Sequence, residues 1–220
     1  MMRNAAIAVV VLLFAGLAAL RGVSPSSPKT VPTTHVRRGR VQVTVYTVGH
    51  STRTLAELLD LLSRHGIAGV ADVRRFPASR RHPHFAREAL LRALDERGVR
   101  YDWLPELGGR RSSRPDSPHV AWRAAGFRAY ADHMESAEFR TGLERLLELA
   151  PARPTAVLCA EAVPWRCHRQ LIADALVARD LSVMHVTGPG AASPHRLTPF
   201  ARLEGERVIY DGGQLRMRAD

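Results

Sequence analysis

Cysteine and lysine are scarce in this 220-residue chain. The few cysteines exclude certain classes of protein, and the lack of lysine limits what the basic charge can indicate. Two Cys cannot build a disulfide scaffold or a four-Cys zinc site. Lys29 is the only lysine, so 31 of the 32 basic residues are Arg, a bias as typical of a GC-rich genome as of phosphate binding. Hydrophobic residues at 45% and charged residues at 24% are ordinary, which excludes wholesale disorder and predicts a globular core.

Acidic residues are absent from the first 42 positions, which carry six basic side chains. The formal net charge of +11 therefore falls to +5 over the remaining chain, with 26 basic and 21 acidic residues. A sequence pI near 11.1 alone does not indicate a nucleic-acid-binding protein.

One long hydrophobic run, residues 5–20, lies in the same segment. As a helix it would span about 24 Å, less than the hydrocarbon thickness of about 30 Å. Such a run is typical of a signal peptide or of a short membrane anchor. A third interpretation is that the start codon is assigned too early and that translation begins near Val43. We therefore separate a segment 1–42 from a domain 43–220. We expect the domain to be cytoplasmic or, alternatively, anchored to a membrane or exported through residues 1–21, with membrane contact only through 5–20.

Short β-branched and apolar runs alternate with amphipathic stretches from Val43 onward. We expect strands over 43–48, 67–73, 99–104, 155–160 and 181–187. We expect helices from a cap at Ser51 or Thr52 to Gly66, over 85–97, over 126–149 with a break at Ser136, and over 165–179. A hairpin is expected within 197–213. This alternation predicts a single α/β domain with a mainly parallel sheet of about five strands and helices on both faces.

Ligands of such sheets bind outside the carboxyl ends of the strands. Polar and reactive side chains follow the expected strands at that edge: His50, Asp72, Arg74, Glu161, Arg166, Cys167, His168 and Arg169. We expect these residues to converge on one concave pocket, with Cys159 buried beneath it and Cys167 nearer the cavity.

The densest chemistry is in the segment CAEAVPWRCHR, residues 159–169. Cys167, His168 and Arg169 are expected in the first turn of a helix, where the helix dipole favours anions and lowers the pKa of a thiol. Two interpretations stay open: Cys167 is a nucleophilic or redox thiol, or both cysteines are packing residues. The spacing differs from that of cysteine phosphatases, no CxxC is present, and Cys159, Cys167 and His168 lack a fourth metal ligand. We therefore expect no metal and no cofactor.

Candidate roles follow from residue type. The candidate catalytic residues are His50, Glu161, Cys167 and His168, with Glu161 as acid or base and a histidine assisting. The candidate anion-binding residues are Asp72, Arg74, Arg166 and Arg169. The alternatives are a structural His50, a structural Asp72–Arg74 ion pair, and basic loops that are only a solvated surface.

Five motifs occur in the order TVGHST, DVRRFPASRR, YDWLPELGGRR, FRAYADHM and CAEAVPWRCHR. Together they resemble the domain of unknown function 488 family over roughly residues 43–190. The resemblance implies a compact bacterial or archaeal α/β domain without an established activity. By similarity, the family pattern falls on His50, Asp72, Arg74, Pro77, Leu107, Gly108, Gly109, Tyr130, Cys159, Glu161, Cys167, His168 and Arg169.

Three hypotheses of function remain at this point. The first is an enzyme that acts on an anionic small molecule, a nucleotide or another phosphate-bearing substrate derived from nucleic acid. The second is a non-catalytic accessory module that binds nucleic acid through the same basic edge. The third is a thiol-redox protein that uses Cys167.

Overall fold

The computed structural model describes residues 43–78 and 81–212, so the apolar run 5–20 and the rest of the segment 1–42 lie outside the described residues. Within the described part, no helix is long and apolar enough to cross a membrane. The main sheet contains β1 (Thr44–Gly49), β2 (Gly69–Asp72), β3 (Arg100–Trp103), β4 (Thr155–Cys159), β5 (Ser182–Val186) and β6 (Ser193–Pro194). A separate hairpin pairs β7 (Arg202–Glu204) with β8 (Arg207–Ile209).

The strand order in the main sheet is β3-β2-β4-β1-β5-β6. The pairs among β1 to β5 are all parallel, and only the short edge strand β6 is antiparallel, to β5. The α/β class with a mainly parallel sheet is therefore confirmed. The sequence pattern missed β6, because a two-residue strand carries no periodicity.

Five α-helices connect these strands: α1 (Leu55–Arg64), α2 (Arg87–Asp95), α3 (Ala125–Met134), α4 (Ala137–Leu149) and α5 (Arg169–Val177). Three short 3-10 turns accompany them: η1 (Pro83–Phe85), η2 (Pro105–Leu107) and η3 (Pro164–Arg166). Ser136 is the N-cap of α4 and accepts from the amide of Phe139, which confirms the expected break between α3 and α4.

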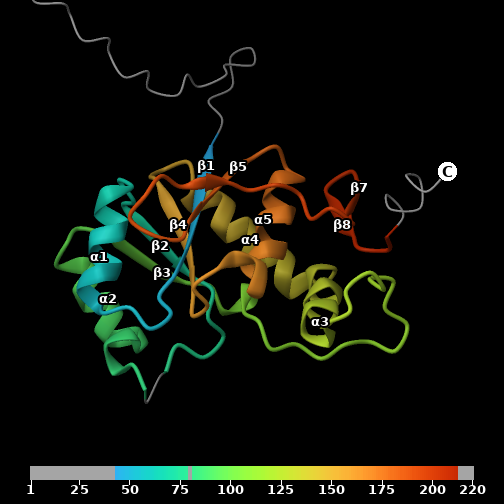
Figure 1. Cartoon of the computed structure of the whole chain (residues 1–220), viewed down its shortest axis with the longest axis horizontal. Coiled ribbons are helices and arrows are strands. Elements are labelled where there is room, and N and C mark those ends of the chain that lie inside the picture. Colours follow the sequence, from blue (N-terminus) through green and yellow to red (C-terminus); the bar gives the residue numbers. More distant parts are fainter. Residues whose placement is uncertain (1–42, 79–80, 213–220) are drawn as a thin grey trace, which may run out of the picture. The chain divides into compact units, whose positions relative to one another are not determined.

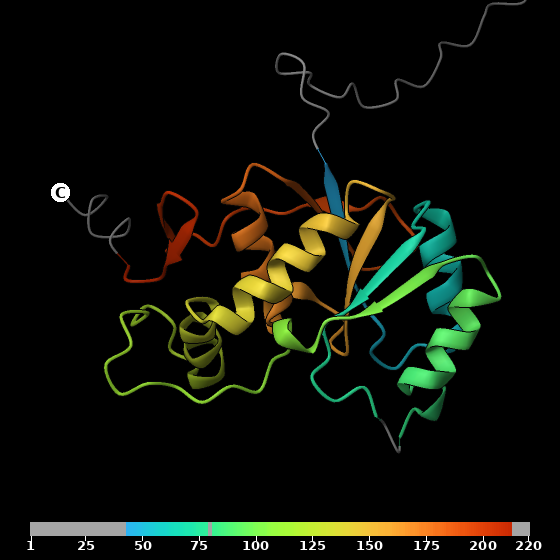
Figure 2. The ribbon, with the colours of Figure 1, turned by 180° about the vertical axis from the view of Figure 1, so that it is seen from behind.

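Helices cover both faces of the sheet, as Figure 1 and the reverse view in Figure 2 show. Leucines of α1 and α2 pack with Val48, Val70 and Leu158 in one hydrophobic core. Side chains of α3, α4 and α5 pack with Val45 and Val157 in a second core on the other face. The division follows from the alternation of side chains along each strand.

The helices that follow β1 and β4 lie on opposite faces, although these two strands are neighbours in the sheet. Chain connections therefore diverge at the carboxyl ends of β1 and β4, and this divergence defines a topological switch point. The amides of His50 and Ser51 continue the pairing beyond the strands, donating to the carbonyl oxygens of Cys159 and Ala160 at 3.0 and 2.7 Å.

Two helix starts differ from the sequence-based expectation. Thr54 caps α1 in a capping box with Glu57, rather than Ser51 or Thr52, because residues 51–53 complete a turn first. The helix expected from 165 begins only at Arg169, because Pro164 starts the turn η3 and Cys167 then takes an extended conformation. Cys167 and His168 therefore precede α5, and His168 is its N-cap residue.

Candidate functional site

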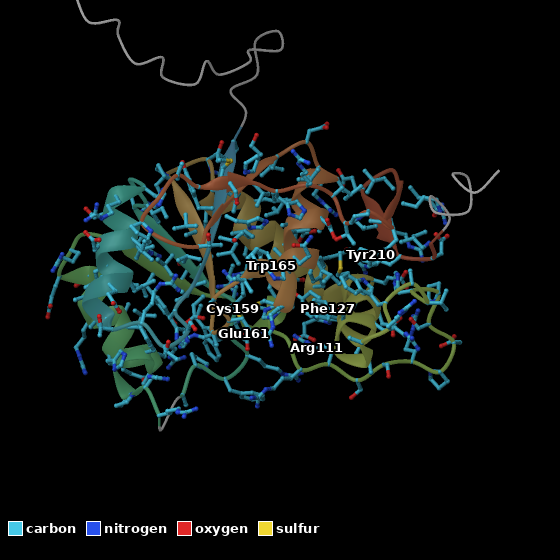
Figure 3. The ribbon with its side chains drawn as sticks, viewed as in Figure 1. Arg111, Phe127, Cys159, Glu161, Trp165 and Tyr210 are labelled. Carbon is cyan, nitrogen blue, oxygen red and sulfur yellow. The ribbon has the colours of Figure 1, made fainter. Side chains whose placement is uncertain are left out.

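A cavity of about 400 Å³ opens at the switch point. Figure 3 places the labelled Cys159, Glu161 and Phe127 near this edge of the sheet. The walls come from the loops after β2, β3 and β4 and from α3: Arg74, Arg75, Phe76, Ala78, Gly109, Arg110, Gly126, Phe127, Tyr130, Cys159, Ala160, Glu161, Arg166, Cys167 and His168. Five of the candidate residues thus share one cavity, namely Arg74, Glu161, Arg166, Cys167 and His168.

Cys159, Cys167 and His168 form a cluster, which we call the CCH cluster. The Nδ1 atom of His168 lies 3.8 Å from the sulfur of Cys159 and 3.6 Å from that of Cys167. Both cysteines are free thiols and both are buried. The Nε2 atom of His168 has no hydrogen-bond partner among the described residues, so no third group orients this ring as a general base.

The two thiols differ in acidity. The neighbouring Cys159 thiol holds the pKa of Cys167 well below its ordinary value, with further support from His168 and from the charge of Arg169. The pKa of Cys159 is raised by the neighbouring Cys167 thiol and by burial. Cys167 is therefore the more acidic thiol of the pair.

Arg169 does not reach the cavity. Its side chain is 1% exposed, its Nε donates to the sulfur of Cys167 at 3.4 Å, and a second guanidinium nitrogen donates to the carbonyl oxygen of Glu161. No carboxylate among the described residues pairs with it. A buried cation needs a nearby anion, so Arg169 stabilises the Cys167 thiolate and holds the loop rather than facing a ligand.

Two glycines permit the close packing around the cluster. A Cβ on Gly49 would lie 1.7 Å from the carbonyl oxygen of Glu161, so a side chain there would push β1 away from the loop after β4. A Cβ on Gly109 would lie 2.9 Å from Nδ1 of His168. Gly109 thus lets the loop after β3 pack closely against the histidine ring.

Asp72 and Arg74 form a buried ion pair at the end of β2. Asp72 accepts from the backbone amide of Arg74 at 3.0 Å, from its Nε at 2.9 Å and from the hydroxyl of Tyr101 at 2.8 Å. Burial alone would lower the pKa of Arg74, but the hydrogen bonds and charge of Asp72 raise it above its ordinary value. Asp72 is fully buried and does not line the cavity, so it orients Arg74 and contacts no ligand.

His50 lies outside the cavity, on the opposite side of the sheet from His168. Its ring packs on Phe85, with ring centroids 4.3 Å apart, and Phe85 belongs to the core under α1 and α2. The structure therefore places His50, Asp72 and Arg169 next to the cavity wall, in contact with Arg74 or Cys167, and not in the wall itself. A Cβ built on Gly49 would face the loop after β4. Because side chains alternate along a strand, the side chain of the next residue, His50, points away from that loop.

Burial gives the protein a predictable response to acid. Desolvation lowers the pKa of His50 and of His185 to about 4, assisted at His50 by the charge of Arg74 and at His185 by His195. The unfolded chain binds these protons near pH 6.5, so the free energy of unfolding falls as the pH drops from 6.5 toward 4. We expect a slope of up to about 1.4 kcal/mol per pH unit for each histidine, measured by urea unfolding between pH 7 and 5. The variant His185→Gln should have a shallower slope, and equal slopes in variant and wild type would contradict the assignment.

The sequence reasoning missed part of the cavity wall. Arg75, Arg110 and Phe127 line the cavity but were not among the candidate residues. Arg110 has a φ of 59°, a strained value for a residue other than glycine that is enriched at functional sites. The FRAYADHM motif was the available signal for Tyr130, whose hydroxyl donates to the carbonyl oxygen of Leu107 at 2.6 Å and whose ring lies 4.9 Å from that of His168.

The fold and the cavity define a class: a doubly wound α/β domain with a cysteine-, histidine- and arginine-lined cavity at its switch point. The chain belongs to the family described as Domain of unknown function DUF488, whose sequence model matches residues 54–176. That range contains every candidate residue except His50. Comparisons with curated proteins and with solved structures found no match.

Proposed function

We propose that the cavity binds a phosphate-bearing anion of the size of a nucleotide. The observation that carries this proposal is the charge of the wall: Arg75, Arg110 and Arg166 line it, and none of them pairs with a carboxylate of a described residue. Among the described residues of the wall, Glu161 carries the only carboxylate. Unpaired guanidinium groups around a concave surface favour phosphate, whose oxygens accept two hydrogen bonds from one Arg.

Exposed aromatic rings favour a nucleotide over inorganic phosphate. Phe76 lines the cavity with 66% of its surface exposed, and Trp165, next to Arg166, is 64% exposed. Single exposed apolar side chains are ordinary on a protein surface, so the position of Phe76 in the cavity wall is what favours a ligand contact. A nucleobase stacked on such a ring gains about 1–3 kcal/mol.

The CCH cluster supports an enzyme more than a binding module. It puts a low-pKa thiol and an imidazole into the same wall as the arginines. A module that only binds nucleic-acid backbone needs no such groups. The nucleic-acid-binding module stays the second candidate, because the same arginines would also contact backbone phosphates.

Calorimetric titration of the full chain with inorganic phosphate, AMP and a short single-stranded DNA tests both candidates. We expect AMP to bind more tightly than phosphate. Arg166→Ala should weaken both by about tenfold or more, the loss of one charge-assisted hydrogen bond. Phe76→Ala should weaken AMP binding and leave phosphate binding unchanged. Arg92→Ala, an exposed arginine of α2 outside the cavity, is the matched control and should change neither.

Other outcomes select against the proposal. Affinity for AMP that is the same in Arg166→Ala and in wild type would overturn it. Binding of DNA alone, with an affinity that falls steeply with salt and survives Glu161→Gln, would favour the accessory module.

A further inference from the structure

The spacing of the CCH cluster matches the coordination shell of a metal ion. The sulfur atoms of Cys159 and Cys167 and the Nδ1 atom of His168 all lie within 4.8 Å of one another. A tetrahedral ion with zinc–sulfur bonds of about 2.3 Å and a zinc–nitrogen bond of about 2.0–2.1 Å holds its sulfur and nitrogen ligands about 3.6 Å apart. The two sulfur–nitrogen distances here are 3.8 and 3.6 Å.

We propose that Cys159, Cys167 and His168 bind one Zn²⁺ ion, with its fourth coordination position open to the cavity. Thiolate and imidazole donors in a tetrahedral arrangement select zinc over magnesium or calcium. The lack of a fourth protein ligand, which made the sequence predict no metal, is a regular property of reactive zinc sites, where water or substrate completes the shell.

The surroundings leave room for that fourth ligand. All three donor residues line the cavity, so an ion between them is reachable from it. Gly109 faces Nδ1 of His168, where any side chain would lie 2.9 Å from the donor atom. A glycine at this position keeps the donor face of the ring accessible.

Charge balance predicts what the fourth ligand would be. Zn²⁺ with two thiolates and a neutral imidazole has no net charge. Arg169, buried 3.4 Å from the sulfur of Cys167 and without a carboxylate partner among the described residues, would then keep one unbalanced positive charge. A hydroxide or an anionic substrate oxygen in the fourth position balances it.

The metal site goes beyond the proposed anion binding, and neither depends on the other. If both hold, the arginines of the wall bring an anionic group to an ion that polarises one of its oxygens or activates a water. That combination is typical of metal-assisted hydrolysis.

To test the proposal, the full chain with reduced thiols is titrated with Co²⁺, which serves as a spectroscopic probe. Zn²⁺ is then added in competition with the bound Co²⁺. We expect about one ion per chain and a sulfur-to-cobalt charge-transfer absorption in the near ultraviolet with intense visible bands of a tetrahedral site. Cys159→Ser, Cys167→Ser and His168→Ala should each weaken Co²⁺ binding by at least about tenfold. His65→Ala, at the end of α1 and outside the cluster, is the control and should bind as wild type does.

A wild-type chain that shows no charge-transfer band on addition of Co²⁺ overturns the proposal, whether or not the variants fold. So does rapid alkylation of both cysteines in the presence of equimolar Zn²⁺, the result expected of a free thiol-redox pair. Arg166→Ala should retain the cobalt spectrum while it loses affinity for AMP. Failure of the metal site and failure of anion binding are therefore read from different measurements.

Discussion

Asp72→Ala is expected to lower the free energy of unfolding by about 3–5 kcal/mol, the usual result of removing one partner of a buried ion pair. Asp72 is fully buried, and its loss would leave the guanidinium of Arg74, 7% exposed, without a counter-charge. The hydroxyl of Tyr101 would lose its acceptor as well. Urea unfolding monitored by circular dichroism measures the change.

Two further variants separate the charge effect from the rest. Tyr101→Phe removes one hydrogen bond to the same carboxylate and should cost about 1 kcal/mol. Asp72→Ala combined with Arg74→Met removes both charges and should regain at least half of the loss, because no uncompensated cation remains. A double variant as unstable as Asp72→Ala would show that the loss comes from packing and not from the buried charge.

The sequence was sufficient to predict which strand ends carry the candidate site. Parallel strands deliver their carboxyl ends to one edge, so the positions of Arg74, Glu161, Arg166 and the CCH cluster followed from their places at the end of β4 and in the connections after β2 and β4. The break at Ser136 also followed, because a serine N-cap is a local signal.

The rest depended on geometry that local patterns do not contain. His50 turned to the other face because a shift of one residue along a strand reverses the side of the sheet. Arg169 turned inward because the turn after Pro164 delayed the start of α5. Arg110 lies in the long connection between β3 and α3, which has no periodicity to read, and Phe127 reaches the cavity from the first turn of α3. The distances between the sulfur atoms and Nδ1 of His168 depended on how the connection from β4 to α5 folds, which no local pattern describes.

Asp174 of α5 is the centre of a buried network that no local sequence pattern indicated. It is fully buried and accepts from the amide and hydroxyl of Thr198 at 2.9 and 2.7 Å, from the hydroxyl of Tyr210 at 2.8 Å and from Nε2 of His195 at 2.9 Å. His195 in turn contacts His185 of β5 at 3.0 Å. These bonds attach the chain from residue 193 to 210 to the sheet and to α5.

We therefore expect Asp174→Ala to lower the free energy of unfolding by about 3–5 kcal/mol, since it leaves several buried donors without an acceptor. Thr198→Val, which removes only one of these donors, should cost about 1 kcal/mol. Hydrogen exchange should accelerate most over 193–210 in Asp174→Ala. Because α5 begins directly after the CCH cluster, the same variant should also bind Co²⁺ more weakly if the helix positions the cluster. Faster exchange in the tail with unchanged Co²⁺ affinity would instead restrict the network to docking the tail.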